Sequence, residues 1–267
     1  MIETGESTLS ELERGRLRAA EPDSAASNGW RVNPEAKAAI LACFADRRTE
    51  GWTIGPFAFQ DRVGVPPKQL FASPDALVAE AAGRPWRIVP GGTSIRAGVH
   101  LEPGVVIMPP AFLNIGAWVG EDAMIDSHVL VGSCAQIGAR VHLAGAVQIG
   151  GVLEPAGARP VIVEDDAFVG AGACLLDGVL VRAGAVIAAG AILTGTSTLY
   201  DYVGERVLFG TVDEPLVVPA EAVVVPGVRP ARGAFAEGLG LGIATALIVK
   251  YRDAGTSARV ALEGILR

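Results

Sequence analysis

The sequence has few cysteines, few aromatic residues and no long hydrophobic run. Its three cysteines, Cys43, Cys134 and Cys174, are too few and too scattered for a disulfide framework or a paired-cysteine metal site, so we expect reduced thiols. No stretch approaches 18 apolar residues without glycine, proline or charge, so we expect no transmembrane helix and no membrane partner. The first residues lack the basic and apolar regions of a signal peptide, which predicts a cytoplasmic protein.

Basic residues are also in deficit. The 267 residues include 22 Lys and Arg against 29 Asp and Glu, which gives a formal net charge of −7. Because a nucleic-acid surface requires a positive field, this balance argues against a nucleic-acid partner. A local group of basic residues could still meet a phosphate-bearing cofactor.

Aliphatic residues, in contrast, are abundant and recur every six positions. A period of six fits neither a helix, at 3.6 residues per turn, nor a strand, at two. It fits a coil of three short strands in which one aliphatic per hexad points inward, so we predict a mainly β protein built on a parallel β-helix. Val163 follows Ile149 by 14 positions, which is not a multiple of six and therefore predicts a loop that leaves the coil there. The periodic positions are Val89, Ile95, Leu101, Ile107, Leu113, Val119, Ile125, Val131, Ile137, Leu143 and Ile149, then Val163, Val169, Leu175, Val181, Ile187 and Leu193.

We divide the chain into a helical N-terminal domain (1–85), the β-helix (86–226) and a short C-terminal strand-helix segment (227–267). Asn33 and Pro34 form an N-cap and a first helical position, so the helix that follows them is the clearest of the N-terminal predictions. The expected helices are 9–20, 36–45, 73–82 and 258–267; 51–68 is expected to be irregular, 194–210 a loop or hairpin, 216–225 a last turn, 227–242 mobile and 243–251 a strand.

Two strings carry a resemblance to a known family. Val131-Gly-Ser-Cys-Ala-Gln-Ile-Gly138 and Gln148-Ile-Gly-Gly-Val-Leu-Glu-Pro155 resemble the tetrahydrodipicolinate N-succinyltransferases, which are hexapeptide-repeat acyltransferases. Shorter stretches, among them Met124-Ile-Asp-Ser127, extend the resemblance over nearly the whole chain. It implies a left-handed β-helix, a homotrimer with active sites between neighbouring coils, and an acyl-CoA co-substrate without a permanently bound cofactor.

The resemblance places Asp126 at the amine of the substrate, an acyclic amino dicarboxylate. A carboxylate there can orient the amine and accept its proton as the nitrogen attacks the thioester. Ser127 and His128 would contact the substrate beside it. Residues 18 apart stack in such a coil, so Asp126 lies between Met108 and Ala144, and a neighbouring chain would have to supply any cation. The alternative is a turn aspartate that binds its own backbone.

Other residues complete the expected site. The resemblance gives Arg87 to the substrate, whose carboxylate a guanidinium can hold with two parallel hydrogen bonds, and Arg96 is a second candidate. Glu154 belongs to the loop that leaves the coil and could cover a neighbour's cleft. Solvated surface charge or a structural role is the alternative for each. The acyl-CoA candidates are Gly170, Ala188, Lys250 and Arg259.

Two departures from the family pattern affect the mechanism. Where several members have a second acidic residue, this chain reads Ala171-Gly-Ala-Cys174, which leaves Asp126 as the one obvious base. A basic C-terminal string of some relatives is replaced by Gly255-Thr-Ser-Ala-Arg259, so the CoA phosphate contacts are expected to be fewer or different. Nothing in the hexads distinguishes succinyl from acetyl transfer; succinyl is the first prediction and an acetyltransferase the alternative.

Histidine chemistry is the competing prediction. A histidine is the general base of many hexapeptide acyltransferases, and His128 is a better candidate than His100 or His142 because it lies two residues from Asp126. A carbonic-anhydrase-like zinc site would need three histidines to converge across an interface, and we expect no metal. Cys134 and Cys174 lack basic neighbours that would activate a thiol nucleophile. A non-catalytic or scaffold trimer is the remaining alternative.

Overall fold

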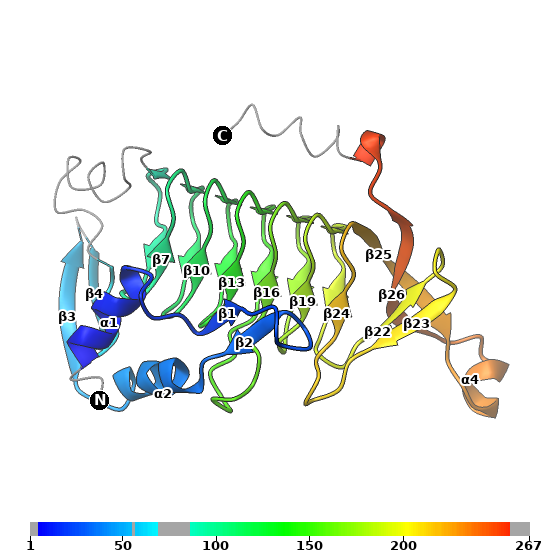
Figure 1. Ribbon diagram of the computed structural model, residues 1–267, viewed down its shortest axis with the longest axis horizontal. Helices are drawn as coiled ribbons and strands as arrows, with labels where there is room; N and C mark the ends of the chain where they lie inside the picture. The colour runs from blue at the N-terminus through cyan, green and yellow to red at the C-terminus, as the bar shows by residue number, and fades with distance from the viewer. Residues whose placement is uncertain (1–4, 55–56, 69–85, 257–267) are drawn as a thin grey trace.

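The computed structural model describes residues 5–54, 57–68 and 86–256, and its body is a prism of short stacked strands (Figure 1). We call residues 87–193 the coil. Three sheets form its sides. The first is β7 (His100–Leu101), β10 (Trp118–Val119), β13 (Gln136–Ile137), β16 (Ile162–Val163), β19 (Leu180–Val181) and β24 (Val217–Val218). The second is β6 (Ser94–Ile95), β9 (Phe112–Leu113), β12 (Leu130–Val131), β15 (Gln148–Ile149), β18 (Cys174–Leu175) and β21 (Ile192–Leu193).

The third sheet has ten strands, because the C-terminal elements join it. Six belong to the coil: β5 (Arg87–Ile88), β8 (Val106–Ile107), β11 (Met124–Ile125), β14 (His142–Leu143), β17 (Phe168–Val169) and β20 (Val186–Ile187). The others are β25 (Ala222–Pro230), β26 (Gly242–Tyr251), β22 (Thr198–Asp201) and β23 (Arg206–Phe209).

The register confirms a parallel coil with 18 residues per turn. Met124 pairs with His142, and Trp118 with Gln136, in parallel ladders. The periodic aliphatics from Ile95 to Leu193 are buried and form one continuous core. Gln136 pairs with Ile162, 26 residues on, so the loop after Ile149 adds eight residues and the coil then resumes in register. The period of six therefore identifies the residues that point inward.

Glycine occurs in the coil for two different reasons. Gly116 has φ +77 at a corner, a left-handed conformation that L side chains rarely adopt. At Gly170 the reason is the close approach of the next turn, since a Cβ there would lie 2.5 Å from the backbone nitrogen of Ala189. Non-glycine residues also occupy left-handed corners, including His128 (φ 64) and Cys134 (φ 65).

The N-terminal layer, residues 5–54 and 57–68, is less helical than predicted. The helix after Asn33 is confirmed as α2 (Pro34–Cys43), and the Asn33 side chain accepts a hydrogen bond from the Ala36 backbone at 3.0 Å. The first helix, α1 (Gly5–Glu13), ends well before Ala20, at a left-handed Gly15 (φ 69). The layer also contains β1 (Ala20–Pro22), β2 (Trp30–Val32) and a hairpin of β3 (Thr49–Ile54) and β4 (Phe57–Arg62). The 51–68 prediction was thus wrong in part, and 73–82 lies outside the described residues.

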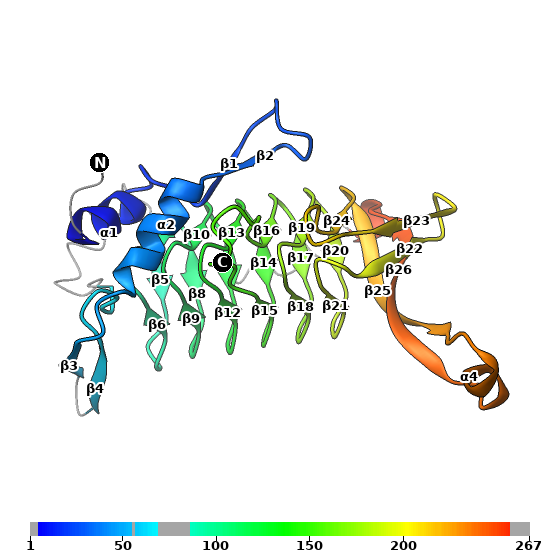
Figure 2. The same cartoon turned by 90° about the horizontal axis from the view of Figure 1, so that it is seen from below.

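Beyond the coil, the chain forms two antiparallel ribbons. β22 and β23 confirm the hairpin alternative for 194–210. β25 and β26 form a long arm with α4 (Ala234–Gly238) at its tip, so 227–242 is structured and the 226/227 boundary falls inside β25. Figure 2 shows this arm and the β3–β4 hairpin projecting from opposite ends of the prism. β26 confirms the strand at 243–251, while the helix expected at 258–267 lies outside the described residues.

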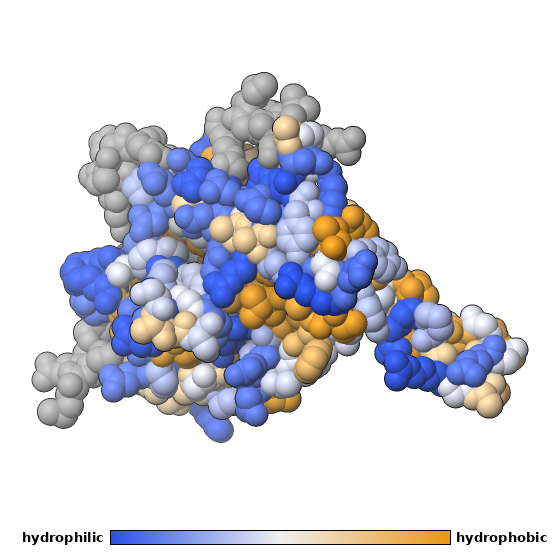
Figure 3. Space-filling model, turned by 45° about the vertical axis from the view of Figure 1, so that its right-hand side comes forward, coloured by the Kyte–Doolittle hydropathy of each residue, from blue (hydrophilic) through white to orange (hydrophobic). Residues whose placement is uncertain are grey.

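Apolar surface is exposed towards the C-terminal end. Figure 3 shows orange, hydrophobic side chains there, on the body and on the arm. The exposed large side chains include Phe209 (70%), Val212 (85%), Val228 (71%) and Phe235 (78%). Among the described residues, no helix is both long and apolar enough to span a bilayer.

Candidate functional site

Asp126 begins a column of small residues that runs along one corner of the prism. It follows β11, and its backbone N–H donates to Leu143 O at 2.9 Å, which stacks Ala144 above it. Gly170 and Ala188 continue the column after β17 and β20. The corner consists of Asp126, Ser127, Ala144, Gly145, Gly170, Ala171, Ala188 and Ala189; we call it the small-residue corner. The coil thus brings Asp126 and the two predicted acyl-CoA contacts Gly170 and Ala188 into one line.

Asp126 contacts a histidine, and it is not the expected one. His142 Nε2 lies 3.0 Å from Asp126 Oδ2, with the two side chains 5% and 25% exposed. His142 is the first residue of β14, directly above Met124, so it faces Asp126 diagonally across two neighbouring strands. Among the described residues, His142 is the sole ion-pair partner of Asp126. These two residues are 16 positions apart, so the rule that residues 18 apart stack does not reveal their contact.

The other histidines lie elsewhere. His128 is exposed on a left-handed corner two residues after Asp126, and in the described part of the chain the Asp126 carboxylate pairs with His142 instead. His100 lies on the first sheet, with Nδ1 2.8 Å from Glu13 O and Nε2 3.0 Å from Glu102 Oε1, and it stacks on Trp118. Within the described ranges, no three His, Cys, Asp or Glu side chains lie close enough together to hold a metal ion.

The two predicted arginines lie on different sides of the prism. Arg87, exposed on β5, is in the same outward-facing column as Val106, Met124 and His142, because these residues pair in register. Arg96 follows β6 at another corner, where its guanidinium pairs with Asp61 and its side chain is 19% exposed. Arg87 therefore shares a face with Asp126, whereas Arg96 binds the N-terminal layer.

Glu154 lies on the loop that leaves the coil, and its side chain is exposed. A buried lysine of α2 fixes this loop: Lys37 Nζ donates to Pro155 O at 3.2 Å and to Ala158 O at 2.7 Å. Burial lowers the pKa of Lys37, because the charged ammonium loses hydration. Glu154 is thus presented by an anchored loop, and its expected role over a neighbour's cleft stays a prediction.

A hollow lies at the upper end of the small-residue corner. It is lined by Gly190 and the 196–198 turn on one side and by Arg229 and Thr245 of the arm on the other. Lys250 does not line this hollow; it lies opposite Val223 on β25, and its Nζ is 3.0 Å from Asp253 Oδ2. Arg259 lies outside the described residues. Arg229 is a basic candidate that the sequence analysis missed, since it lay in the segment expected to be mobile.

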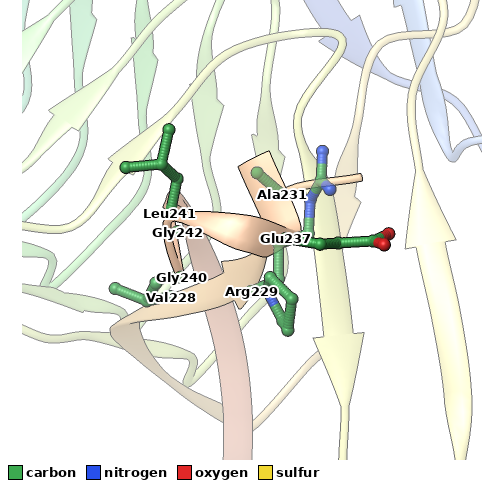
Figure 4. A pocket seen from close by; sticks show the side chains of 8 residues that line it. Val228, Arg229, Ala231, Glu237, Gly240, Leu241 and Gly242 are labelled. Atoms are coloured by element: carbon green, nitrogen blue, oxygen red, sulfur yellow. The ribbon is translucent and has the colours of Figure 1, made fainter. Parts of the chain in front are cut away.

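A second hollow occupies the tip of the arm. Figure 4 shows it between Val228 and Leu241 on one side and Glu237 of α4 on the other. Arg229 lines this hollow as well. None of the candidate residues predicted from the sequence lines it.

The cysteines show no sign of nucleophile chemistry. Burial raises the pKa of the Cys134 thiol to about 12, and it also raises the pKa of Cys43. A thiol whose pKa is raised is poorly ionised at neutral pH and therefore a poor nucleophile. Cys174 is half-buried on β18, where it pairs in register with Gln148.

Comparisons with known proteins agree with this architecture. Residues 160–195 match a family model described as the hexapeptide repeat of succinyl-transferase. The chain is 38% identical over 260 residues to a 2,3,4,5-tetrahydropyridine-2,6-dicarboxylate N-succinyltransferase of Rickettsia akari, covering 97% of this chain and 87% of the relative. A protein with the same name from Idiomarina loihiensis is 40% identical, covering 97% and 86%. The acetyltransferase domain of PglB from Neisseria gonorrhoeae, solved with acetyl coenzyme A, is 18% identical over 52% of this chain and 51% of that chain. Its TM-score is 0.24.

Proposed function

Since the chain belongs to the 2,3,4,5-tetrahydropyridine-2,6-dicarboxylate (tetrahydrodipicolinate) N-succinyltransferase family, with its left-handed β-helix, we propose that it transfers succinyl from succinyl-CoA to an amino dicarboxylate. The acceptor is the amine of the acyclic form, 2-amino-6-oxopimelate, in the diaminopimelate route to lysine. The observation that carries this proposal is the Asp126 carboxylate, partly exposed at the start of the small-residue corner.

The chemistry needs one base and no covalent enzyme intermediate. The lone pair of the amine nitrogen forms a bond to the thioester carbonyl carbon. The carbon–sulfur bond then breaks, and its electron pair leaves with the CoA sulfur. Asp126 accepts the proton lost by the nitrogen and passes it on to the thiolate, so that the products are an N-succinyl amide and free CoA.

Arg87 is suited to a substrate carboxylate. Strands stack about 4.8 Å apart, so Arg87, two turns below Met124, begins roughly 10 Å from the turn that carries Asp126. A seven-carbon dicarboxylate bound along this face could place its amine at Asp126 and a carboxylate near the Arg87 guanidinium. Arg96 pairs with Asp61 at another corner of the prism, whereas Arg87 lies on the face that carries His142 and Asp126, so its position favours Arg87 over Arg96.

The small-residue corner is suited to an extended acyl-CoA arm. Ala144, Gly170 and Ala188 have little or no side chain, so a thin chain can lie against their backbone. The hollow at the C-terminal end of this corner adds Arg229. Acyl-CoA binds here as a co-substrate, with its thioester at Asp126 and its phosphates towards the arm.

The active assembly in this proposal is a homotrimer. The partly exposed Asp126 and the exposed apolar side chains near the C-terminal end support a site completed by a neighbouring copy. Light scattering after size-exclusion chromatography is expected to give three times the protomer mass of 27.4 kDa. A monomer at micromolar concentration would contradict this part of the proposal.

A thiol-release assay tests the function. Purified protein is given succinyl-CoA or acetyl-CoA with 2-aminopimelate as the stable acceptor amine. We expect faster turnover with succinyl-CoA, and Asp126→Asn is expected to lower kcat at least tenfold while the assembly stays intact. Preference for acetyl-CoA would identify an N-acetyltransferase acting on a related amino dicarboxylate, and a fully active Asp126→Asn variant would remove Asp126 from the mechanism.

A further inference from the structure

His142 is an unusual residue for the outside of a coil. Because side chains alternate along a strand, Leu143 points into the core and His142 points outward, yet its side chain is only 5% exposed. Its neighbours in register are Met124 below and Phe168 above. The rings of His142 and Phe168 meet edge to face, with centroids 5.1 Å apart and planes at 85°. Packing therefore limits the orientations that this imidazole can adopt.

The imidazole engages one oxygen of Asp126. An ionised carboxylate can only accept hydrogen bonds. The N–H in this contact therefore belongs to His142 Nε2, which donates a hydrogen bond to Asp126 Oδ2 at 3.0 Å. Among the described residues, no hydrogen bond is made to the other oxygen, Oδ1. One oxygen is thus fixed by a packed ring, and the other is left for a substrate.

We propose that His142 is a positioning residue for Asp126, an inference that rests on the proposed acyl transfer. The terminal torsion of an aspartate is broad, so a carboxylate held only at its Cβ samples many orientations. The hydrogen bond from His142 narrows this range and keeps Oδ1 directed towards the reacting amine. Productive alignment of a base is worth orders of magnitude in rate, so the contribution falls on kcat rather than on substrate affinity.

A purely structural histidine would satisfy its N–H in the same way, so the variants must separate the two roles. His142→Phe keeps a ring against Met124 and Phe168 but removes the donor. His142→Gln places an amide N–H at a similar reach, yet cannot act as a proton acceptor. The matched control is His100→Phe, which removes an imidazole–carboxylate contact of the same 3.0 Å length from another side of the prism.

We expect His142→Phe to lower kcat at least tenfold in the thiol-release assay, with both KM values within twofold of wild type. His142→Gln is expected to recover kcat to within about threefold, and His100→Phe to stay within twofold. If His142 acts through Asp126, the double variant Asp126→Asn/His142→Phe will be no slower than Asp126→Asn alone, whereas a structural role would multiply the two losses. Should the Phe variant not fold, His142→Leu, which also lacks the donor, replaces it in the comparisons of kcat with the wild type and with the double variant.

Three results would overturn the positioning role: a His142→Phe variant within threefold of wild type, a Gln variant as slow as the Phe variant, or multiplicative losses in the double variant. In each of these cases wild-type turnover with succinyl-CoA leaves the proposed function standing. A wild-type protein that releases no CoA from either donor overturns the proposed function and the positioning role together.

Discussion

In the coil, each hexad buries one aliphatic side chain in a common core, whereas the N-terminal layer is bound to the outer surface of the coil through a few hydrogen bonds between polar side chains. Arg18 Nε donates to Gln136 Oε1 at 2.6 Å, and Trp30 Nε1 donates to Glu164 Oε1 at 2.9 Å. A small apolar cluster that includes Ile40 of the layer and Cys134 of the coil also packs between the two regions; we call this boundary the seam. The coil is therefore stabilised by many equivalent residues, and the layer by a few individual ones.

This difference predicts where single substitutions matter. In the coil, the cost of a substitution depends on how much apolar volume is lost, and it should be similar at equivalent positions. In the N-terminal layer, it depends on which buried polar group loses its partner.

The largest expected effect concerns the seam, where Cys134 is buried. With its pKa at about 12 instead of 9.0, the thiolate fraction at pH 8 is roughly a thousandfold below that of an ordinary thiol. Iodoacetamide labelling at pH 8, read by peptide mass spectrometry, is expected to modify the half-exposed Cys174 first and Cys134 only on unfolding. Because the folded pKa is the higher one, the stabilisation from the neutral thiol is complete below pH 9 and is lost between pH 9 and about 12. Equal labelling rates would contradict the burial of Cys134.

In the coil, Ile137→Ala is expected to lower the free energy of unfolding by about 2–5 kcal/mol, because it opens a cavity in a close-packed core. Chemical denaturation measures this loss. Ile192→Ala is the control: its side chain is 61% exposed on the outside of β21, and the expected change is below about 0.5 kcal/mol. Similar losses at both sites would show that the period of six does not decide burial.

In the N-terminal layer, Lys37→Met keeps the length of the side chain but leaves Pro155 O and Ala158 O without their donor. We expect a loss of about 1–3 kcal/mol, together with faster proteolysis within the loop at 150–161. Limited proteolysis followed by mass spectrometry locates the cut. A variant whose loop resists protease as well as wild type would show that Lys37 does not anchor it.

Trp30→Phe is expected to cost about 1 kcal/mol, since it removes one hydrogen bond to Glu164 and keeps a smaller aromatic ring at this position. Glu164 keeps its contacts with Arg182 Nη1 (2.7 Å) and the Ala183 backbone N–H (3.0 Å), which limits the loss. Thermal unfolding followed by circular dichroism is the measurement. A loss above about 3 kcal/mol would mean that the indole contributes mainly by packing.

The smallest effect is expected for an exposed ion pair of the coil. Asp166→Asn weakens the contacts with Arg140, whose Nε and Nη2 both lie 2.7 Å from the carboxylate, and the side chains are about half exposed. Surface pairs contribute little, so we expect a change below about 0.5 kcal/mol, and asparagine tolerates the left-handed φ of 61 at this position. If chemical denaturation shows that the free energy of unfolding changes by more than about 1 kcal/mol, this surface pair stabilises the protein as much as a hydrogen bond of the seam.

The same comparison explains what the sequence could predict. The coil, its eight-residue excursion and the inward residues follow from the spacing of aliphatics, since every turn repeats the same environment. The strands β1 and β2, of three residues each, carry no period and form where Trp30 and its neighbours meet the coil. They depend on contacts with residues more than 100 positions away, which a local pattern cannot show.

For the candidate site, resemblance located Asp126, and the register of the coil shows that the candidates Gly170 and Ala188 lie on the same corner. The contact with His142 could not be found by stacking residues 18 apart, because His142 is the diagonal neighbour of Asp126, two positions earlier in the next turn. Arg229 was not predicted because it lies in the segment 227–242, whose glycine and alanine content suggested mobility, although β25 extends through Arg229. Pairing register, rather than sequence distance, decides both placements.

Both ends of the coil are closed by other parts of the chain. At the first turn, Lys68 N–H donates to Ile95 O at 2.7 Å and Ala97 N–H to Pro66 O at 2.9 Å, and at the last turn β25 pairs with β20 and β26 then pairs with β25. A stack of parallel strands with bare edges is a template for adding further strands, and so for growing end to end into fibres. Residues 66–68 and the arm occupy edge positions where a second molecule would otherwise add, which favours a particle of fixed length that can accumulate to high concentration.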